Sequence, residues 1–182
     1  MLSFAHFERA LPLSEFLSTF GTVEDRVRWD AGKSRVHLIP EQTTSLSGFT
    51  RRMNLMILAG AWCHDCSTQC PIFERFAEVS PKILVRYLDR DAHKEIAEEL
   101  KVNGGGRVPV IVVYSEDGFE VCRMGDRTHT GYRKLMGTLL PDFQSLDREA
   151  WERGFAADWL RELERSQWML RLSPRLKRLH GD

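Results

Sequence analysis

The sequence has no excess of either charge and no long apolar segment near its beginning. Lysine plus arginine total 26 in 182 residues, and aspartate plus glutamate also total 26. A net charge of zero gives no global attraction to polyanions, so we expect neither nucleic acid nor a membrane as a partner. Charged residues and Pro12 interrupt residues 1–16, so we also expect no signal peptide or membrane span there.

Cysteine is scarce, and the 4 cysteines present are too few to staple a chain of this length. Three of them, Cys63, Cys66 and Cys70, lie close together in the sequence, which indicates chemistry rather than a disulfide framework. Without an export signal we expect a cytoplasmic protein. In a reducing cytoplasm a Cys-x-x-Cys pair is more often catalytic or metal-binding than structural.

The sequence contains no glycine-rich phosphate-binding motif. The run Gly104–Gly106 precedes a strand pattern instead of opening a helix, which argues against a nucleotide or dinucleotide loop. A structural zinc site normally draws ligand pairs from two loops, and the sequence has no second Cys-x-x-Cys or histidine pair. We therefore expect neither a cofactor nor a bound metal.

Apolar runs of strand length alternate with helical patterns through the middle of the chain. We expect strands at 54–59, 83–88, 109–114 and 120–124, and helices at 66–79, at 92–102 and in a last segment that ends near 140. This order predicts an α/β fold. Its sheet should pair parallel strands first and an antiparallel hairpin last.

Helical patterns flank this domain on both sides. We expect residues 1–52 to form an N-terminal helical extension packed on the core, 53–140 the α/β domain, and 141–182 a C-terminal helical extension. The C-terminal extension places aromatic and leucine side chains at helical intervals, so one face should dock on the domain; an exposed stripe for a partner is the alternative. We expect the basic tail at 171–178 to be frayed and solvated.

The Cys63–Cys66 motif stands where a buried strand gives way to a helix. Free backbone N–H groups and the positive end of the helix dipole favour an anion there, so Cys63 is pushed toward the thiolate. Cys66 follows one turn later and is near enough to form a small-loop disulfide. We therefore expect Cys63 to attack a substrate disulfide and Cys66 to resolve the mixed disulfide, which is thiol-disulfide oxidoreductase chemistry.

The surroundings of this motif resemble the thioredoxin superfamily. Trp62 stands immediately before the first cysteine, Pro71 lies five residues after the second, and Pro109 opens a later strand, as in that family. More narrowly, the sequence resembles the thioredoxin-like branch with a Trp-Cys-x-Asp-Cys motif, and the resemblance covers about 54–140. It implies a thioredoxin-like fold, in which a central mixed sheet is flanked by helices.

The resemblance also implies how substrates and partners are handled. The Val108–Pro109 bond should be cis, and Trp62, Val108 and Pro109 should bind the substrate beside the catalytic Cys63 and Cys66. The substrate should be a disulfide-containing protein or a small thiol. The electron donor, which the sequence does not identify, should be a thioredoxin-reductase-like enzyme or glutathione.

The chain departs from the family in two places. Thioredoxins hold a buried aspartate, the proton acceptor for the resolving cysteine, where this sequence has Ile57, so a proton would have to pass to Asp65, His64 or water. His64 and Asp65 also replace the usual Gly-Pro pair and are expected to tune the redox pair. Protonated His64 would stabilise the Cys63 thiolate and ionised Asp65 would destabilise it, while a solvated turn histidine and an ordinary helix N-terminal acid are the alternatives.

Two other classes of function stay open from the residues alone. A metal- or iron–sulfur-binding module would use Cys63, Cys66 and Cys70 with either His64 or Cys122. A non-catalytic thioredoxin-like interaction protein would carry its cysteines incidentally. For Cys70 itself we expect a buried free thiol, with exchange between Cys70 and Cys66 as the alternative.

Overall fold

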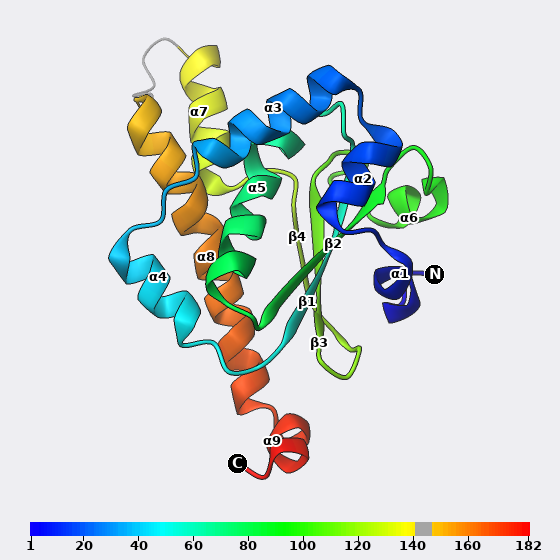
Figure 1. Ribbon diagram of the computed structural model, residues 1–182, viewed down its shortest axis with the longest axis vertical. Coiled ribbons are helices and arrows are strands. Elements are labelled where there is room, and N and C mark those ends of the chain that lie inside the picture. Colours follow the sequence, from blue (N-terminus) through cyan, green and yellow to red (C-terminus); the bar gives the residue numbers. More distant parts are fainter. Residues whose placement is uncertain (141–146) are drawn as a thin grey trace.

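A four-stranded sheet forms the centre of the computed structural model, which describes residues 1–140 and 147–182 (Figure 1). In sheet order the strands are β2 (Ile83–Asp89), β1 (Met53–Ala59), β3 (Val110–Ser115) and β4 (Glu120–Gly125). β1 and β2 are parallel, whereas β3 runs antiparallel to both β1 and β4. The expected α/β class, with parallel pairing first and a hairpin last, is confirmed.

Helices surround this sheet (Figure 1). They are α1 (Phe4–Arg9), α2 (Leu13–Phe20), α3 (Val23–Ser34), α4 (Pro40–Ser47), α5 (His64–Val79), α6 (Lys94–Glu99), α7 (His129–Leu139), α8 (Arg148–Leu172) and α9 (Pro174–His180). The helix expected at 92–102 is shorter than the pattern indicated. It ends at Glu99 with Leu100 as its C-cap, and beyond it Val102 pairs with Gly105 in a tight turn in which Asn103 and Gly104 have positive φ angles.

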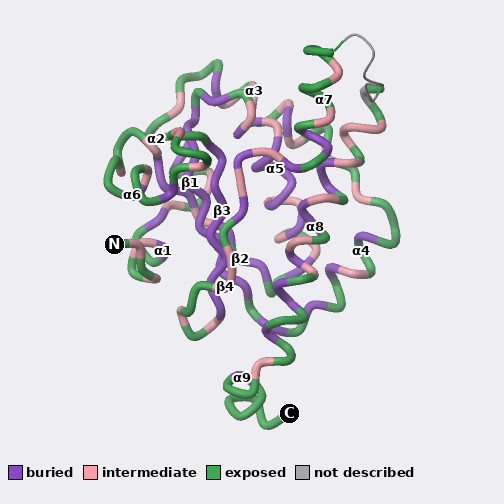
Figure 2. Tube along the Cα trace, turned by 180° about the vertical axis from the view of Figure 1, so that it is seen from behind, coloured by how far each residue is buried: buried purple, intermediate pink, exposed green. Residues whose placement is uncertain are grey.

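The two central strands carry the core. Every residue of β1 and of β3 is buried, which explains their nearly continuous apolar sequences. The polar Asn54 of β1 donates its amide to the carbonyl oxygen of Ser115 at 3.0 Å, so its burial costs no hydrogen bond. Figure 2 shows the buried backbone concentrated in the strands and the facing side of α5. The chain therefore leaves the carboxyl end of β1 inside the core and reaches the beginning of α5 a few residues later.

The N-terminal helices pack directly on this core. Phe16 stacks on Tyr87 of β2 with ring centroids 5.3 Å apart, and Trp29 meets the same tyrosine edge-on at 6.0 Å. Leu11 adds a short antiparallel bridge to Tyr87 at the sheet edge. Helix α3 then runs across α5, and its Gly32 lies against the backbone of Ser67. The first fifty residues thus hold both the edge strand and the helix that carries the cysteines.

The C-terminal helices also contact the domain. On α8, Phe155 and Trp159 are buried, and Gln167 bonds to both the backbone N–H and the carbonyl of Arg51 at 2.7 and 2.9 Å. The frayed tail expected at 171–178 is wrong for α9, because Leu176 is fully buried and Arg175 donates to Asp117 of the β3–β4 turn. Residues 141–146, part of the expected extension, lie outside the described residues.

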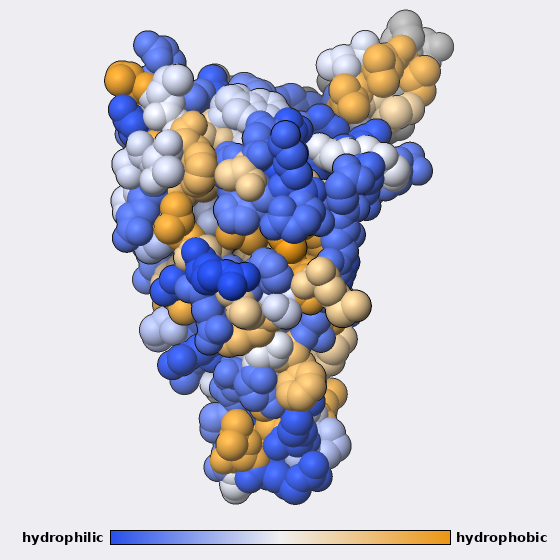
Figure 3. Space-filling view, turned by 90° about the vertical axis from the view of Figure 1, so that its right-hand side faces the viewer, coloured by the Kyte–Doolittle hydropathy of each residue, from blue (hydrophilic) through white to orange (hydrophobic). Residues whose placement is uncertain are grey.

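Apolar side chains are also exposed at the end of α7, where Leu135, Met136, Leu139 and Leu140 are at least partly open to solvent. In Figure 3 orange atoms gather on the projection beside the grey atoms, and further orange patches lie among the hydrophilic atoms of the same face. None of the helices within residues 1–140 and 147–182 has the length and apolar character needed to cross a bilayer.

Candidate active site

The two cysteines of the motif meet at the first turn of α5. Cys63 is the N-cap residue, and its sulfur accepts a hydrogen bond from the backbone N–H of Cys66 at 3.4 Å. Both are free thiols. Cys63 retains 8% of its surface exposed, whereas Cys66 is fully buried. Of the two, Cys63 is therefore the one that an outside disulfide meets first.

The surroundings of Cys63 and Cys66 shift the pKa of both thiols. Burial raises the pKa of Cys66 well above its usual value. The adjacent Cys66 thiol and then burial raise the pKa of Cys63, while the Cys66 backbone N–H acts in the opposite direction. Because a thiolate on either sulfur raises the pKa of the other, the pair loses one proton at a time. The helix N-terminus and the remaining exposure favour that first thiolate on Cys63.

The segment before β3 lies against Cys63. The Val108–Pro109 peptide bond is cis, as the resemblance implied, and the Val108 carbonyl oxygen is 3.8 Å from the Cys63 sulfur. Cys63 can donate its thiol proton to this carbonyl in the reduced state. The backbone of Val108 is thus placed next to the position that a substrate sulfur would take.

Trp62 presents an aromatic face beside the pair. Its side chain is 47% exposed, and its indole nitrogen donates to Asp91 at 3.1 Å. The Arg90 guanidinium lies over the ring, 4.6 Å from its centroid. A Cβ atom at Gly60 would come within 2.7 Å of the same indole, so glycine is needed for this ring position.

The expected tuning residues differ in their surroundings. His64 is exposed, and its backbone carbonyl accepts hydrogen bonds from the hydroxyls of Ser67 and Thr68, each at 2.9 Å. Asp65 is ion-paired with Arg127, and Arg127 also binds the buried Asp126 at 3.1 Å. The Asp65 carboxylate raises the pKa of Cys63, and the paired guanidinium opposes that effect. Arg127 was not predicted from the sequence, because 62 positions separate it from Asp65.

Asp126 anchors this ion-paired group. Burial alone would raise its pKa, but hydrogen bonds from Tyr132 and Arg107 together lower the pKa below its usual value. The buried Asp126 side chain therefore stays negatively charged and forms an ion pair with Arg127. The ion-paired group fixes the segment after β4 against the first turn of α5.

Helix α3 holds the loop before Cys63 from the other side. The Trp29 indole donates to the Ala61 carbonyl at 2.8 Å, and Arg28 donates to the Trp62 carbonyl at 3.0 Å. Trp29 is 1% exposed, so both partners of its bond lie inside the protein. The helical pattern expected over residues 1–52 gave no sign of what this tryptophan would bind. These positioning contacts were missed.

The remaining cysteines are unpaired and occupy different places. Cys70 is fully buried and unpaired, as expected for a buried free thiol, and burial raises its pKa. Cys122 lies on β4, where its sulfur is 3.3 Å from the hydroxyl of Ser166 on α8. Within the described parts of the chain, no three histidine, cysteine or acidic side chains form a group suited to a metal ion.

The comparisons with known proteins agree with this architecture. A family model described as thioredoxin matches residues 10–138, so the match begins well before the 54–140 region of the sequence resemblance and includes α2, α3 and α4. The 1.5 Å crystal structure of a protein of unknown function from Pseudomonas aeruginosa has a TM-score of 0.74 at 16% identity, covering 91% of this chain and 99% of that one. An HIV epitope-scaffold reaches 0.69 at 16% identity, covering 91% and 97%. Identities this low show the fold alone, and no curated protein matches the chain.

Proposed function

The chain belongs to the thioredoxin family, and from that premise we propose that it is a thiol-disulfide oxidoreductase that acts through Cys63 and Cys66. One observation carries the proposal: two free thiols share the N-terminal turn of a helix, and the more exposed one faces the Val108 carbonyl. A helix N-terminus stabilises the attacking thiolate, and the neighbouring backbone offers a place for a substrate chain.

The reaction has two exchange steps. The Cys63 thiolate attacks one sulfur of the substrate disulfide, so a Cys63–substrate bond forms while the substrate's own bond breaks and its other sulfur leaves as a thiolate. Cys66 then gives up its proton and attacks Cys63. The Cys63–Cys66 bond forms, the mixed disulfide breaks, and two electrons have passed to the substrate. The same steps in reverse oxidise a dithiol.

The proposed substrate is an extended segment of a disulfide-containing protein or a small thiol compound. Its main chain would pair with the backbone at Val108 and Pro109, and its side chains would rest on the exposed ring of Trp62. A thioredoxin-reductase-like enzyme or glutathione would return electrons to the pair. A reducing cytoplasm suits a cycle in this direction.

Unequal effects of the two cysteines test the proposal. Cys66→Ser should still attack disulfides but accumulate mixed disulfides, which run as higher-mass bands on non-reducing gels and vanish with reductant. Cys63→Ser should be inert, and the control Cys122→Ser should behave as the parent protein does. Rapid alkylation by iodoacetamide at neutral pH should map to Cys63.

Each alternative class predicts a different result. A metal- or cluster-binding module predicts similar defects from both substitutions, together with near-stoichiometric metal in protein purified under reducing conditions. An interaction protein predicts little effect from either. Equal alkylation of the two cysteines, with no trapped species for Cys66→Ser, would refute the oxidoreductase proposal.

A further inference from the structure

One face of α5 carries three ionisable side chains in a line, which we call the α5 stripe. Cys66, Cys70 and Glu74 follow one another at intervals of four residues, so they lie above each other along the helix. The two thiols are fully buried one helical turn apart, and each shifts the pKa of the other, whereas Glu74 is half-buried. The stripe thus leads from the redox pair to a carboxyl group that solvent can reach.

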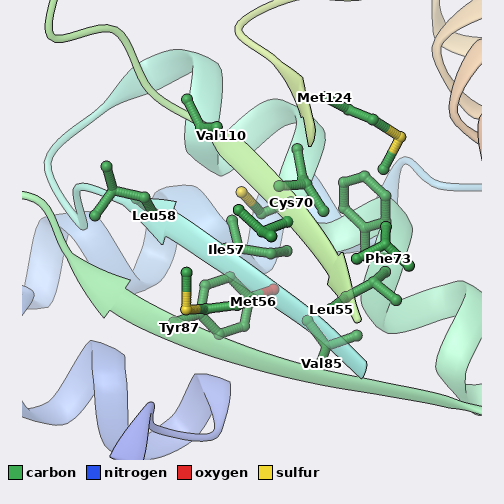
Figure 4. Close-up of a cluster of buried hydrophobic side chains, with 14 of the residues drawn as sticks. Leu55, Met56, Ile57, Leu58, Cys70, Phe73, Val85, Tyr87, Val110 and Met124 are labelled. Atoms are coloured by element: carbon green, nitrogen blue, oxygen red, sulfur yellow. The ribbon is translucent and has the colours of Figure 1, made fainter. Parts of the chain in front are cut away.

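Tyr87 of β2 contacts the Glu74 end of the α5 stripe from the sheet side. It is fully buried, and its hydroxyl donates to a Glu74 carboxylate oxygen at 2.8 Å. Tyr87 pairs with Ile57 in the β1–β2 register, so the two side chains occupy the same face of the sheet. Figure 4 shows Cys70, Ile57 and Tyr87 together in the buried cluster. The rings of Phe16 and Trp29 pack on Tyr87 and limit its movement.

The resolving step needs a proton acceptor on this buried side. Cys66 is fully buried, and burial raises its pKa, so a thiolate there forms only if a nearby group takes the proton. The strand residue at position 57 is an apolar isoleucine. Asp65, which the sequence analysis offered as an acceptor, is engaged by Arg127, and His64 is exposed.

We propose that Glu74 takes up, by way of Cys70 and Tyr87, the proton that Cys66 releases as it resolves the mixed disulfide. This inference rests on the proposed function and deepens it. As Cys66 attacks Cys63, the proton moves along the α5 stripe to the Glu74 carboxylate, and the substrate sulfur leaves with the electron pair of the broken bond. Glu74 later loses the proton to solvent. Because it touches neither sulfur of the redox pair, Glu74 is a positioning residue.

The charges around Glu74 suit this role. Burial raises its pKa, which makes the carboxylate a better proton acceptor near neutral pH than an exposed glutamate. Tyr87 of β2 donates to it, Lys33 of α3 lowers its pKa, and Glu78 on α5 raises it. Lys33 also forms an ion pair with Glu78 at 2.6 Å. The Glu74 carboxyl group therefore lies between the buried thiols of the α5 stripe and the charged surface residues Lys33 and Glu78.

Rapid mixing with dithiobis(nitrobenzoate), an aromatic disulfide with a coloured thiolate, separates the two exchange steps. The first thiolate is released when Cys63 forms the mixed disulfide, and the second when Cys66 displaces it. At high reagent concentration the second release limits the rate. Its rate is measured between about pH 6 and pH 10, a range that brackets the usual thiol pKa, in the parent protein, in Glu74→Gln and in the control Glu78→Gln.

Glu74→Gln should slow the second release about tenfold or more at neutral pH, a typical loss when a proton acceptor is removed. Its rate should rise steadily with pH and approach the parent rate near the alkaline limit, where hydroxide takes the proton. The first release should not change. Glu78→Gln removes the same charge one turn farther on, and its second release should stay within about twofold of the parent.

Two further variants keep the test decisive. Tyr87→Phe keeps the ring and removes the hydroxyl, so it should slow the second release alone. Glu74→Asp keeps a carboxyl group and should retain the parent pH profile; urea unfolding checks that each variant is folded. A folded Glu74→Gln or Tyr87→Phe with the parent's second rate at every pH overturns the inference. Absence of the first release from the parent protein would overturn the proposed function itself.

Discussion

Replacing Gly32 with alanine is expected to push α3 away from α5. A Cβ atom at this buried glycine would lie 2.0 Å from the carbonyl oxygen of Ser67, far inside van der Waals contact. The obstacle is helix backbone, which cannot rotate aside as a flexible side chain would. The two helices must therefore separate by more than an ångström, and the Trp29 bond to Ala61 must stretch with them.

The size of this effect follows from two opposing terms. Overpacking of a close contact typically costs about 1–3 kcal/mol, and a clash with backbone falls at or above the upper end. Alanine gains about 1 kcal/mol over glycine in a helix interior. We expect Gly32→Ala to lower the free energy of unfolding by about 2 kcal/mol, measured by urea denaturation at neutral pH.

Gly106 supplies a matched control for this substitution. No atom lies within 4 Å of a Cβ built there, so Gly106→Ala should change the free energy of unfolding by less than about 0.5 kcal/mol or increase it slightly. If Gly32→Ala is as stable as the parent protein or more stable, the close packing of α3 on α5 described above is wrong.

Three further predictions concern the contacts that position the site and the tail. Arg127→Ala leaves the Asp65 carboxylate unpaired and should raise the pKa of Cys63, which slows alkylation about two- to fivefold at low salt; a difference that persists unchanged at high salt would contradict this. Trp29→Phe removes the 2.8 Å bond to the buried Ala61 carbonyl and leaves it only the longer bond from Arg28 at 3.4 Å, so it should cost about 1–3 kcal/mol in urea denaturation, and an unchanged midpoint would refute it. Leu176→Ala should cost about 2–4 kcal/mol because the side chain is fully buried, and no cost would favour the solvated tail.

The sequence predicted the elements whose pattern is local. The apolar run of β1, the helical spacing after Cys66 and the hairpin of the last two strands each depend on local pattern, and all three are found. The order of these elements then limits the topology to few choices, which is why the mixed sheet was predicted. The shortened α6 was missed because the helix ends at Glu99 and the chain turns at Asn103, whereas the apolar pattern runs on to Val102.

The contacts that shape the site were not predictable in the same way. Three of these contacts join segments that are not adjacent in sequence: Trp29 with Ala61, Arg127 with Asp65, and Tyr87 with Glu74. The periodicity of a segment does not show which distant residue its side chains will contact. The same reason explains the tail, where Leu176 and Arg175 find their partners on the α/β domain. A family comparison finds part of this signal, since the thioredoxin match begins at residue 10.

Equilibration with glutathione redox buffers tests the central claim most directly. The protein is quenched with acid at each buffer ratio, and the oxidised species is mapped by mass spectrometry after digestion. We expect one reversible two-electron transition at a potential between roughly −270 and −120 mV, the range of known thioredoxin-fold oxidoreductases, with the bond joining Cys63 to Cys66. Thiols that stay reduced across the whole range, or a disulfide that joins Cys66 to Cys70 instead, would contradict the account.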